Sequence, residues 1–167
     1  MRYEGRHERS QRTRAAPGLE PCLERLWRYA LVLSGANDTA ESLVQATCRR
    51  AVERADLVPA DGRLDRWLFA MLRSIWLDEI RPRRIKEAKG FVDAEGAVSS
   101  DGAFEIGANI LATQVLKSIA RLPEAQRETA LLVYGEGYSY AEAASALSIP
   151  IDAVMSRLAA ARSALAK

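Results

Sequence analysis

The stretch "YSYAEAASALSIPIDAVMSRLAAAR", Tyr138 to Arg162, contains two helical patterns separated by a short turn. Ser139 and Glu142 fit the capping box S-x-x-E, which marks the start of the first helix. The letters "LSIP" form the turn, because Pro interrupts the helical pattern there. In the second helix the predicted inward face consists of Ile151, Val154, Leu158 and Ala161. This arrangement is typical of a helix-turn-helix.

The second helix of this motif has little hydrogen-bonding capacity. Readout in the major groove of DNA usually relies on Arg, Lys, Asn or Gln side chains that pair with base edges. This helix offers only Ser156, Arg157 and Arg162 for contact with phosphate or base edges. Asp152, at its N-terminus, would repel an approaching phosphate. The motif alone therefore leaves open whether this helix reads DNA or serves another partner.

The remaining segments also show helical periodicity, and none alternates with period two over a useful length. The first helix has a predicted buried face of Leu23, Leu26, Trp27, Ala30 and Leu33. Gly35 is expected to end it, and Asn37 or Asp38 to cap the next helix. That helix, "TAESLVQATCRRAVERA", has a predicted inward face of Ala40, Leu43, Val44, Thr47 and Ala51.

The segment "LDRWLFAMLRSIWLDEIR" predicts a third helix, which follows a loop over "DLVPADGR". Its apolar stripe consists of Leu64, Trp67, Leu68, Met71, Leu72 and Ile75. Four other side chains are expected largely outside the stripe: Arg66, Arg73, Trp76 and Arg81. Pro82 is expected to end the helix, because it cannot donate a backbone hydrogen bond and disfavours helical geometry in the residue before it.

These patterns predict an all-α fold of two small helical domains joined by a flexible linker, with the helix-turn-helix in the C-terminal domain. Residues 1–18 are expected to be a basic disordered tail, and residues 19–86 form the first domain. Residues 87–105, which contain repeated Gly, Ser and Asp, are the predicted linker. The second domain covers residues 106–167 and begins with the helices "ILATQVLKSIARL" and "PEAQRETALLVYGEG".

The composition limits the classes of partner. The chain has 24 Lys and Arg against 22 Asp and Glu, a net charge of +2, so any contact with DNA must be local. Cys22 and Cys48 lack the spacing of a metal site and are expected to be reduced core residues. We expect no metal and no cofactor. Without a membrane-spanning apolar run or the apolar stretch of a signal peptide, no membrane insertion and a cytoplasmic location are expected.

An enzyme is not expected. The chain has no phosphate-binding Gly loop, no GxSxG and no HExxH, and its single histidine, His7, lies in the predicted tail. Asp78 and Glu79 are adjacent on a helix, so their carboxylates diverge. Asp78 is expected to pair with a nearby Arg rather than to act as a general base.

Three segments occur here in a familiar order: "AESLVQATCRRA", "RWLFAMLRSIWLDEIRPRR" and "LPEAQRETALLVYGEGYSYAEAASALSIPIDAVMSRLAAAR". Together they resemble the extracytoplasmic-function (ECF) group of the bacterial sigma-70 family, over nearly all of Leu23 to Lys167. The resemblance implies that the two helical domains are regions 2 and 4. It also implies a transcription initiation factor that directs core RNA polymerase to promoter DNA, helps to open it, and is regulated by an anti-sigma factor.

The resemblance also implies roles for particular residues. In this family the helix that matches "AESLVQAT" docks on the polymerase, which here implies contacts by Glu41, Leu43, Val44 and Gln45. The third helix and its C-terminal end face the downstream promoter element, which implies Arg73, Trp76, Arg81, Arg83 and Arg84. The helix-turn-helix faces the upstream element, which implies Ser139, Tyr140, Ser156, Arg157 and Arg162. An alternative interpretation of the docking helix is that its apolar residues are core and its polar residues merely solvated.

The chain also departs from the family pattern. Ser42 stands where an Asp usually follows the Glu of the docking motif. In the last helix, Asp152 and Ala153 replace an expected Gly-Thr, and Met155 replaces an expected Lys. Two interpretations therefore remain open: a working sigma factor, or a sigma-like interaction protein that acts as a decoy or regulator. The second would bind an anti-sigma factor without productive promoter recognition.

Overall fold

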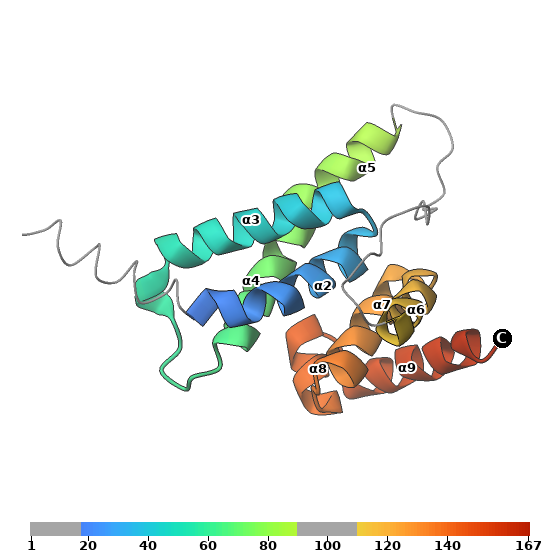
Figure 1. Ribbon diagram of the computed structural model, residues 1–167. Coiled ribbons are helices and arrows are strands. Elements are labelled where there is room, and N and C mark those ends of the chain that lie inside the picture. The colour runs from blue at the N-terminus through green and yellow to red at the C-terminus, as the bar shows by residue number, and fades with distance from the viewer. Residues whose placement is uncertain (1–17, 90–109) are drawn as a thin grey trace, which may run out of the picture. The chain divides into compact units, whose positions relative to one another are not determined.

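The computed structural model describes residues 18–89 and 110–167, and the regular structure in both ranges is helical (Figure 1). The all-α prediction is therefore confirmed. Residues 1–17 of the predicted tail, which include His7, and most of the predicted linker lie outside the described residues. Residue 18 of that tail and residues 87–89 of that linker are helical. In the described ranges, no helix has both the length and the apolar character that a membrane crossing requires.

The chain folds into two compact units. Among the described residues, the first unit holds 18–30 and 38–89, and the second holds Leu31–Asn37 together with 110–167. The division between the units thus falls inside helix α2 (Leu23–Ser34) as well as between residues 89 and 110. Gly35, with a φ of +68°, ends α2 as predicted, because glycine adopts this left-handed conformation without a steric penalty.

The first unit contains helices that pack around a common apolar core. Its elements are η1 (Glu20–Cys22), the first part of α2, α3 (Asn37–Glu53), η2 (Ala55–Leu57), α4 (Leu64–Ile75), η3 (Trp76–Ile80) and α5 (Arg81–Lys89). The ring of Tyr29 on α2 meets the ring of Phe69 on α4 edge to face, with centroids 5.3 Å apart. Both rings are buried and neither was predicted in the core, whereas Leu23, which was, is exposed.

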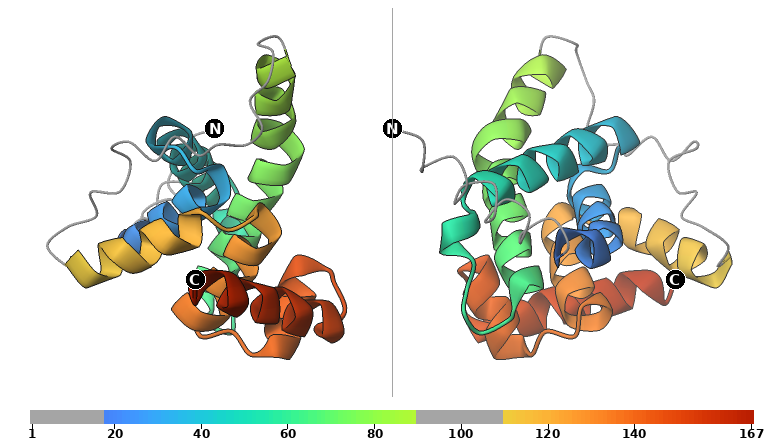
Figure 2. Two further views of the ribbon diagram at one scale, coloured as in Figure 1. Left: turned by 90° about the vertical axis from the view of Figure 1, so that its right-hand side faces the viewer. Right: turned by 60° about the vertical axis from the view of Figure 1, so that its left-hand side comes forward.

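Helix α4 does not end at Pro82, contrary to the prediction. The segments α4, η3 and α5 form one continuous helical rod (Figures 1 and 2). The η3 segment is π-helical, and its hydrogen bond from Arg81 N–H returns to Trp76 O, five residues earlier. Pro82 is then the second residue of a new α-helical segment, where its missing donor is tolerated as it is in any first turn.

The second unit contains the helix-turn-helix. Its elements after residue 109 are α6 (Ile110–Ala120), α7 (Glu124–Ala130), the π-helical η4 (Leu131–Gly135), α8 (Tyr140–Leu147) and α9 (Ile151–Leu165). Helix α9 packs against α7 and α8. As predicted, α9 buries the side chains of Val154, Leu158 and Ala161 completely. Ile151 is 46 % exposed, so its predicted place on the inward face is wrong: it is the first residue of the helix, ahead of the packed span.

A buried arginine contributes to the second unit. Arg127 on α7 donates from Nη1 to the carbonyl oxygen of Leu122 at 3.0 Å. Its Nε and Nη2 donate to the carbonyl oxygens of Val32 at 2.8 Å and Leu33 at 3.2 Å. Burial lowers the pKa of Arg127, and the charge of Glu124 opposes that shift. Three carbonyl acceptors therefore compensate the guanidinium for its lost hydration.

The capping box at the start of α8 yields a stability prediction. Glu142 N–H donates to Ser139 Oγ at 3.1 Å, and Ser139 N–H donates to Glu142 Oε2 at 2.8 Å. Ser139→Ala should therefore lower the free energy of unfolding by about 1 kcal/mol. Ser145→Ala, at an exposed position inside the same helix, is the matched control and should cost nothing. Thermal unfolding followed by circular dichroism measures both, and equal effects would contradict the role of the cap.

Candidate polymerase and nucleic-acid interfaces

The candidate polymerase contacts divide into core and surface residues on α3. Leu43 is fully buried, and Val44 is half-buried. Glu41 and Gln45 are exposed one helical turn apart, and Gln45 Nε2 donates to Glu41 Oε1 at 3.3 Å. Leu43 thus belongs to the core, as the alternative interpretation expected. The polar pair Glu41 and Gln45 remains as the surface that a partner could contact.

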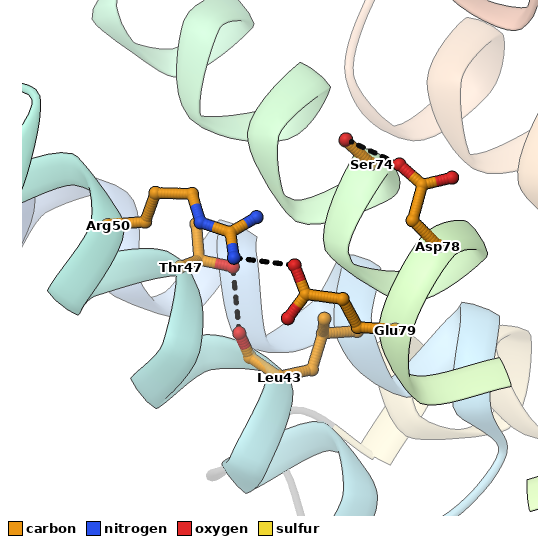
Figure 3. A network of polar contacts seen from close by, with 6 residues as sticks. All are labelled: Leu43, Thr47, Arg50, Ser74, Asp78 and Glu79. Atoms are coloured by element: carbon orange, nitrogen blue, oxygen red, sulfur yellow. Dashed lines mark hydrogen bonds and ion pairs between the residues drawn. The ribbon is translucent and has the colours of Figure 1, made fainter. Parts of the chain in front are cut away.

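A polar network joins α3 to the π-helical turn (Figure 3). Arg50 Nη2 pairs with Glu79 Oε1 at 2.5 Å, which connects the end of α3 to η3. Thr47 Oγ1 donates to the carbonyl oxygen of Leu43 at 2.7 Å, which satisfies the one hydroxyl of the buried α3 face. Ser74 Oγ donates to Asp78 Oδ2 at 3.1 Å, so the partner that the structure shows for Asp78 is a hydroxyl and not the Arg that was expected. Because the ion pair is partly exposed, its role is to orient these helices more than to stabilise them.

The candidates for the downstream promoter element lie along the α4–η3–α5 rod, and they differ in how exposed their side chains are. Arg81 and Arg83 are exposed on α5, while Arg73 on α4 is half-buried. Arg84 Nη1 donates to Thr39 Oγ1 at the start of α3, so this arginine is anchored. The exposed arginines can contact phosphates without a change in the packing of the helices.

Trp76 does not present its ring to solvent. Its side chain is only 4 % exposed, whereas Trp67, expected in the core, is half-buried. Trp76 follows Leu72 by four residues, so it lies on the apolar stripe that was predicted to exclude it. The ring is therefore not available for stacking on an unpaired base of the downstream element in this conformation, because stacking needs an accessible ring face.

The helix-turn-helix places its candidate residues as follows. Helix α8 begins after Ser139 and ends at Ser148, whose φ of +54° makes the turn into α9. Tyr140 is 39 % exposed at the start of α8. On α9, Ser156 and Arg162 are exposed and Arg157 is half-buried. All five candidates are thus at least partly accessible, but Ser139 Oγ already accepts the capping hydrogen bond.

The solvent-facing side of α9 is mainly apolar or small. Its exposed side chains near the N-terminal half are Ile151, Asp152, Met155, Ser156, Ala159 and Ala160. Met155 is 50 % exposed. Among these exposed side chains the hydrogen-bonding groups are the hydroxyl of Ser156 and the carboxylate of Asp152, with the half-buried Arg157 next to Ser156, so few groups are available for direct readout of base edges.

Sequence reasoning did not find Tyr134. This residue lies in η4 and is 54 % exposed, and its Oη accepts a hydrogen bond from Arg162 Nη1 at 2.7 Å. The hydrogen bond that Tyr134 accepts is the main cause that raises the pKa of Arg162. The two residues of the pair are 28 positions apart, so no local spacing rule could have brought them together.

Among the described residues, the cysteines and acidic side chains form no metal site. Cys22 is buried and Cys48 is half-buried, and neither is in a disulfide. Burial raises the pKa of Cys48, which keeps the thiol protonated and weakly reactive. In the two described ranges, no group of three or more His, Cys, Asp and Glu residues could hold a metal ion.

Comparison with known proteins is consistent with the two helical units. Residues 112–165 match the family model of sigma-70 region 4, and residues 19–73 match that of the sigma2 domain of PhyR. Together with the helix-turn-helix of α8 and α9, these matches define a protein of the sigma-70 class.

Similarity over most of the chain identifies the family. The chain is 33% identical over 139 residues to the ECF RNA polymerase sigma factor EcfG of Rhodopseudomonas palustris (strain TIE-1), covering 82% of this chain and 75% of EcfG. It is 33% identical over 134 residues to SigL of Mycobacterium tuberculosis (strain ATCC 25618 / H37Rv), covering 80% and 76%. The chain therefore belongs to the ECF sigma factor family, as its motifs predicted.

A solved structure supports the same assignment. The sigma factor RpoE of Bartonella quintana, crystallised in complex with the anti-sigma factor NepR, superposes with a TM-score of 0.69 at 29% sequence identity. The match covers 90% of this chain and 92% of that chain. The likeness therefore extends over both helical units.

The burial of Trp76 yields a prediction that separates core from surface. Trp76→Ala should lower the free energy of unfolding by about 3–5 kcal/mol, because it leaves a cavity in the first unit. Trp76→Phe should lose less, and Arg83→Gln, an exposed change on the same rod, should leave stability unchanged. Urea denaturation measures all three. A midpoint for Trp76→Ala within the error of Arg83→Gln would show that the ring is not part of the core.

Proposed function

We propose that this chain is an initiating ECF sigma factor, which directs core RNA polymerase to promoters and helps to open them. One observation carries the proposal: the similarity to proteins named ECF RNA polymerase sigma factors spans both units and about three quarters of those proteins. Each unit also has surface groups of the kind that its task requires. Its place of action is then the bacterial cytoplasm, where core polymerase is found.

The proposed polymerase contact is the exposed pair on α3. Glu41 and Gln45 lie one turn apart and hold each other in place through a 3.3 Å hydrogen bond. Because Leu43 fixes the opposite face of the helix in the core, the pair is presented on a rigid support. A partner can therefore bind this surface without reordering the helix.

The proposed downstream contact is the basic helix α5. Arg81 and Arg83 are exposed, and the bond between Arg84 and Thr39 anchors the helix that carries them. Opening a promoter requires bases to leave the stack at a cost of a few kcal/mol, so the separated strand must be held by other contacts. These arginines supply phosphate contacts, while the aromatic surface is not supplied by Trp76 in this conformation.

We further propose regulation by an anti-sigma factor. RpoE of Bartonella quintana forms a complex with NepR, and this chain has the same fold over 90% of its length. A regulator of that kind would act by occlusion, because one protein that covers α3 and the helix-turn-helix blocks both polymerase and promoter DNA. If the regulator uncovered only one of these two surfaces, the chain would regain binding to either polymerase or promoter DNA, but not to both.

A second candidate function rests on two observations. The family model matched by residues 19–73 is that of the sigma2 domain of PhyR, and the solvent-facing side of α9 has few groups that read DNA. A sigma-like regulator would bind an anti-sigma factor and release a different sigma factor, without initiating transcription itself. The two candidates differ in whether the chain binds core polymerase and supports transcription.

Binding to core RNA polymerase tests the proposed function directly. Labelled full-length chain should bind core polymerase, and Glu41→Lys should weaken that binding about tenfold without a change in the free energy of unfolding. Glu53→Lys, the same charge reversal at an exposed position on the same helix, is the matched control. Absence of core binding by the folded wild-type chain would favour the regulator instead. Equal losses for both variants would place the docking surface elsewhere.

Because the exposed side of α9 has few cations, we expect that an added lysine there strengthens binding to duplex DNA. Met155→Lys places a cation on the exposed side of α9. The affinity of the full chain for a random-sequence DNA duplex should rise, and the slope of log K against log salt should steepen by about 0.9. Gln114→Lys, at an exposed position on α6, is the control for added charge alone. If both variants bind equally, α9 does not face the duplex.

A further inference from the structure

We propose that Pro82 sets the helical register of α5 and thereby decides which arginine of this helix faces promoter DNA. Pro82 favours the π-helical turn η3 over a regular α-helical turn, and this wider turn leaves Arg84 towards α3 and Arg83 towards solvent. The inference rests on the proposed function for the DNA contact of α5. Pro82 is a positioning residue, because it acts through the two arginines and need not touch DNA.

A regular α-helix would not accommodate Pro82 at this place. In a helix that ran unbroken from Leu64 to Lys89, Pro82 would lie in the interior, far from the first turn where proline is tolerated. The carbonyl oxygen of Asp78, four residues earlier, would lack its backbone donor, and the proline ring would clash with that carbonyl group. The proline therefore disfavours an unbroken α-helix through this segment.

A π-helical turn directly before the proline removes this conflict. Arg81 N–H donates to Trp76 O, five residues earlier, and a new α-helical segment starts at Arg81. Pro82 then lies in the first turn of that segment. Because the π-helical turn holds one extra residue, every later side chain is rotated by about 100° relative to a continuous α-helix.

The side chains of α5 show this shift of one residue. Arg83 follows Trp76 by seven residues and Leu72 by eleven, and both spacings return to nearly the same side of a regular α-helix. Because Trp76 and Leu72 are buried, a regular helix would turn Arg83 towards the packed side of the rod. Instead Arg83 is exposed, and the next residue, Arg84, is half-buried and donates from Nη1 to Thr39 Oγ1 on α3.

Contacts with one side of α3 hold η3 and α5 in this register. Before the proline, Glu79 in η3 pairs with Arg50 at 2.5 Å (Figure 3). Beyond the proline, Arg84 bonds to Thr39. Thr39 and Arg50 are eleven residues apart, so they lie on the same side of α3. The rotation of α5 can therefore be measured as the choice of the arginine that contacts Thr39.

This register gives two neighbouring arginines different roles. Arg84 uses a donor on Thr39 and anchors the helix, whereas Arg83 presents an exposed guanidinium for phosphate contact. If α5 rotated back by about 100°, Arg83 would take the place of Arg84 at α3, and Arg84 would turn to solvent. The proline thereby determines the side of the rod from which the proposed downstream contact is made.

Double-mutant cycles in urea denaturation test the register in the full chain alone. In the wild-type background, Thr39→Val and Arg84→Gln should shift the midpoint non-additively, because both remove one hydrogen bond, whereas Thr39→Val and Arg83→Gln should add. In Pro82→Ala the helix can become regular, so Arg83→Gln should replace Arg84→Gln in the non-additive pair. Glu87→Ala, an exposed change on α5 that keeps the proline, is the control and should leave the wild-type pairing unchanged.

The consequence for DNA is measured with holoenzyme reconstituted from core RNA polymerase and the full chain. The probe is the promoter duplex that this holoenzyme selects from a randomised library. In the wild type, Arg83→Gln should weaken promoter binding about tenfold and reduce the salt slope by about 0.9, and Arg84→Gln should weaken it less. In Pro82→Ala the two variants should exchange these effects.

The outcomes separate the register from the proposed function. A pairing of Thr39 with Arg84 that persists in Pro82→Ala would overturn the inference, because the π-helical turn would then not depend on the proline. An exchanged pairing without an exchange of the two DNA effects would overturn the role of Pro82 in promoter contact. If the wild-type holoenzyme selects no promoter, the proposed function fails, whereas the double-mutant cycles still decide the register.

Discussion

Complete burial of one face of α9 against α7 and α8 determines which chemistry the second unit can present. Val154, Leu158 and Ala161 are fully buried at helical spacing, so rotation of α9 about its axis would expose all three at a cost of several kcal/mol. Because that face is fixed in the core, the residues on the opposite face must point to solvent. They include Ile151, Met155 and Ser156 near the start of α9 and Arg162 towards its end. The weak base-reading capacity of α9 and the position of Arg162 beside Tyr134 are consequences of the same packing.

The two π-helical turns, η3 and η4, also determine which side chains face solvent. A single extra residue within a helical turn shifts all later side chains by about 100° around the axis. In η3 this shift accompanies the pairing of Glu79 with Arg50 and allows the rod to continue through Pro82 into a basic helix. In η4 the last turn carries Tyr134, the residue that holds Arg162. Both π-helical turns thus lie next to surfaces that we propose to contact DNA.

Much of this architecture was predictable from the sequence, because it depends on local rules. The capping box of Ser139 and Glu142, the stop at Gly35 and the buried face of α9 after its first residue follow from short-range spacing. The errors concern residues whose environment is set by distant packing or by an irregular helix. Trp76 was assigned to the surface although it follows Leu72 by one turn, and Pro82 was expected to end a helix that a π-turn in fact continues. The bond between Tyr134 and Arg162 joins residues that no local pattern relates.

The candidate sites show the same division between local and distant effects. Motif similarity was sufficient to place Glu41 and Gln45 on an exposed turn of α3, yet it also included Leu43, which the core needs. The central claim is that these surfaces serve transcription initiation rather than regulation of another sigma factor. Run-off transcription with purified core RNA polymerase, this chain and a promoter library, followed by sequencing of the transcripts, tests it most directly. The account predicts transcripts that share a bipartite promoter motif. Their absence, with a folded protein that binds core polymerase, would contradict it.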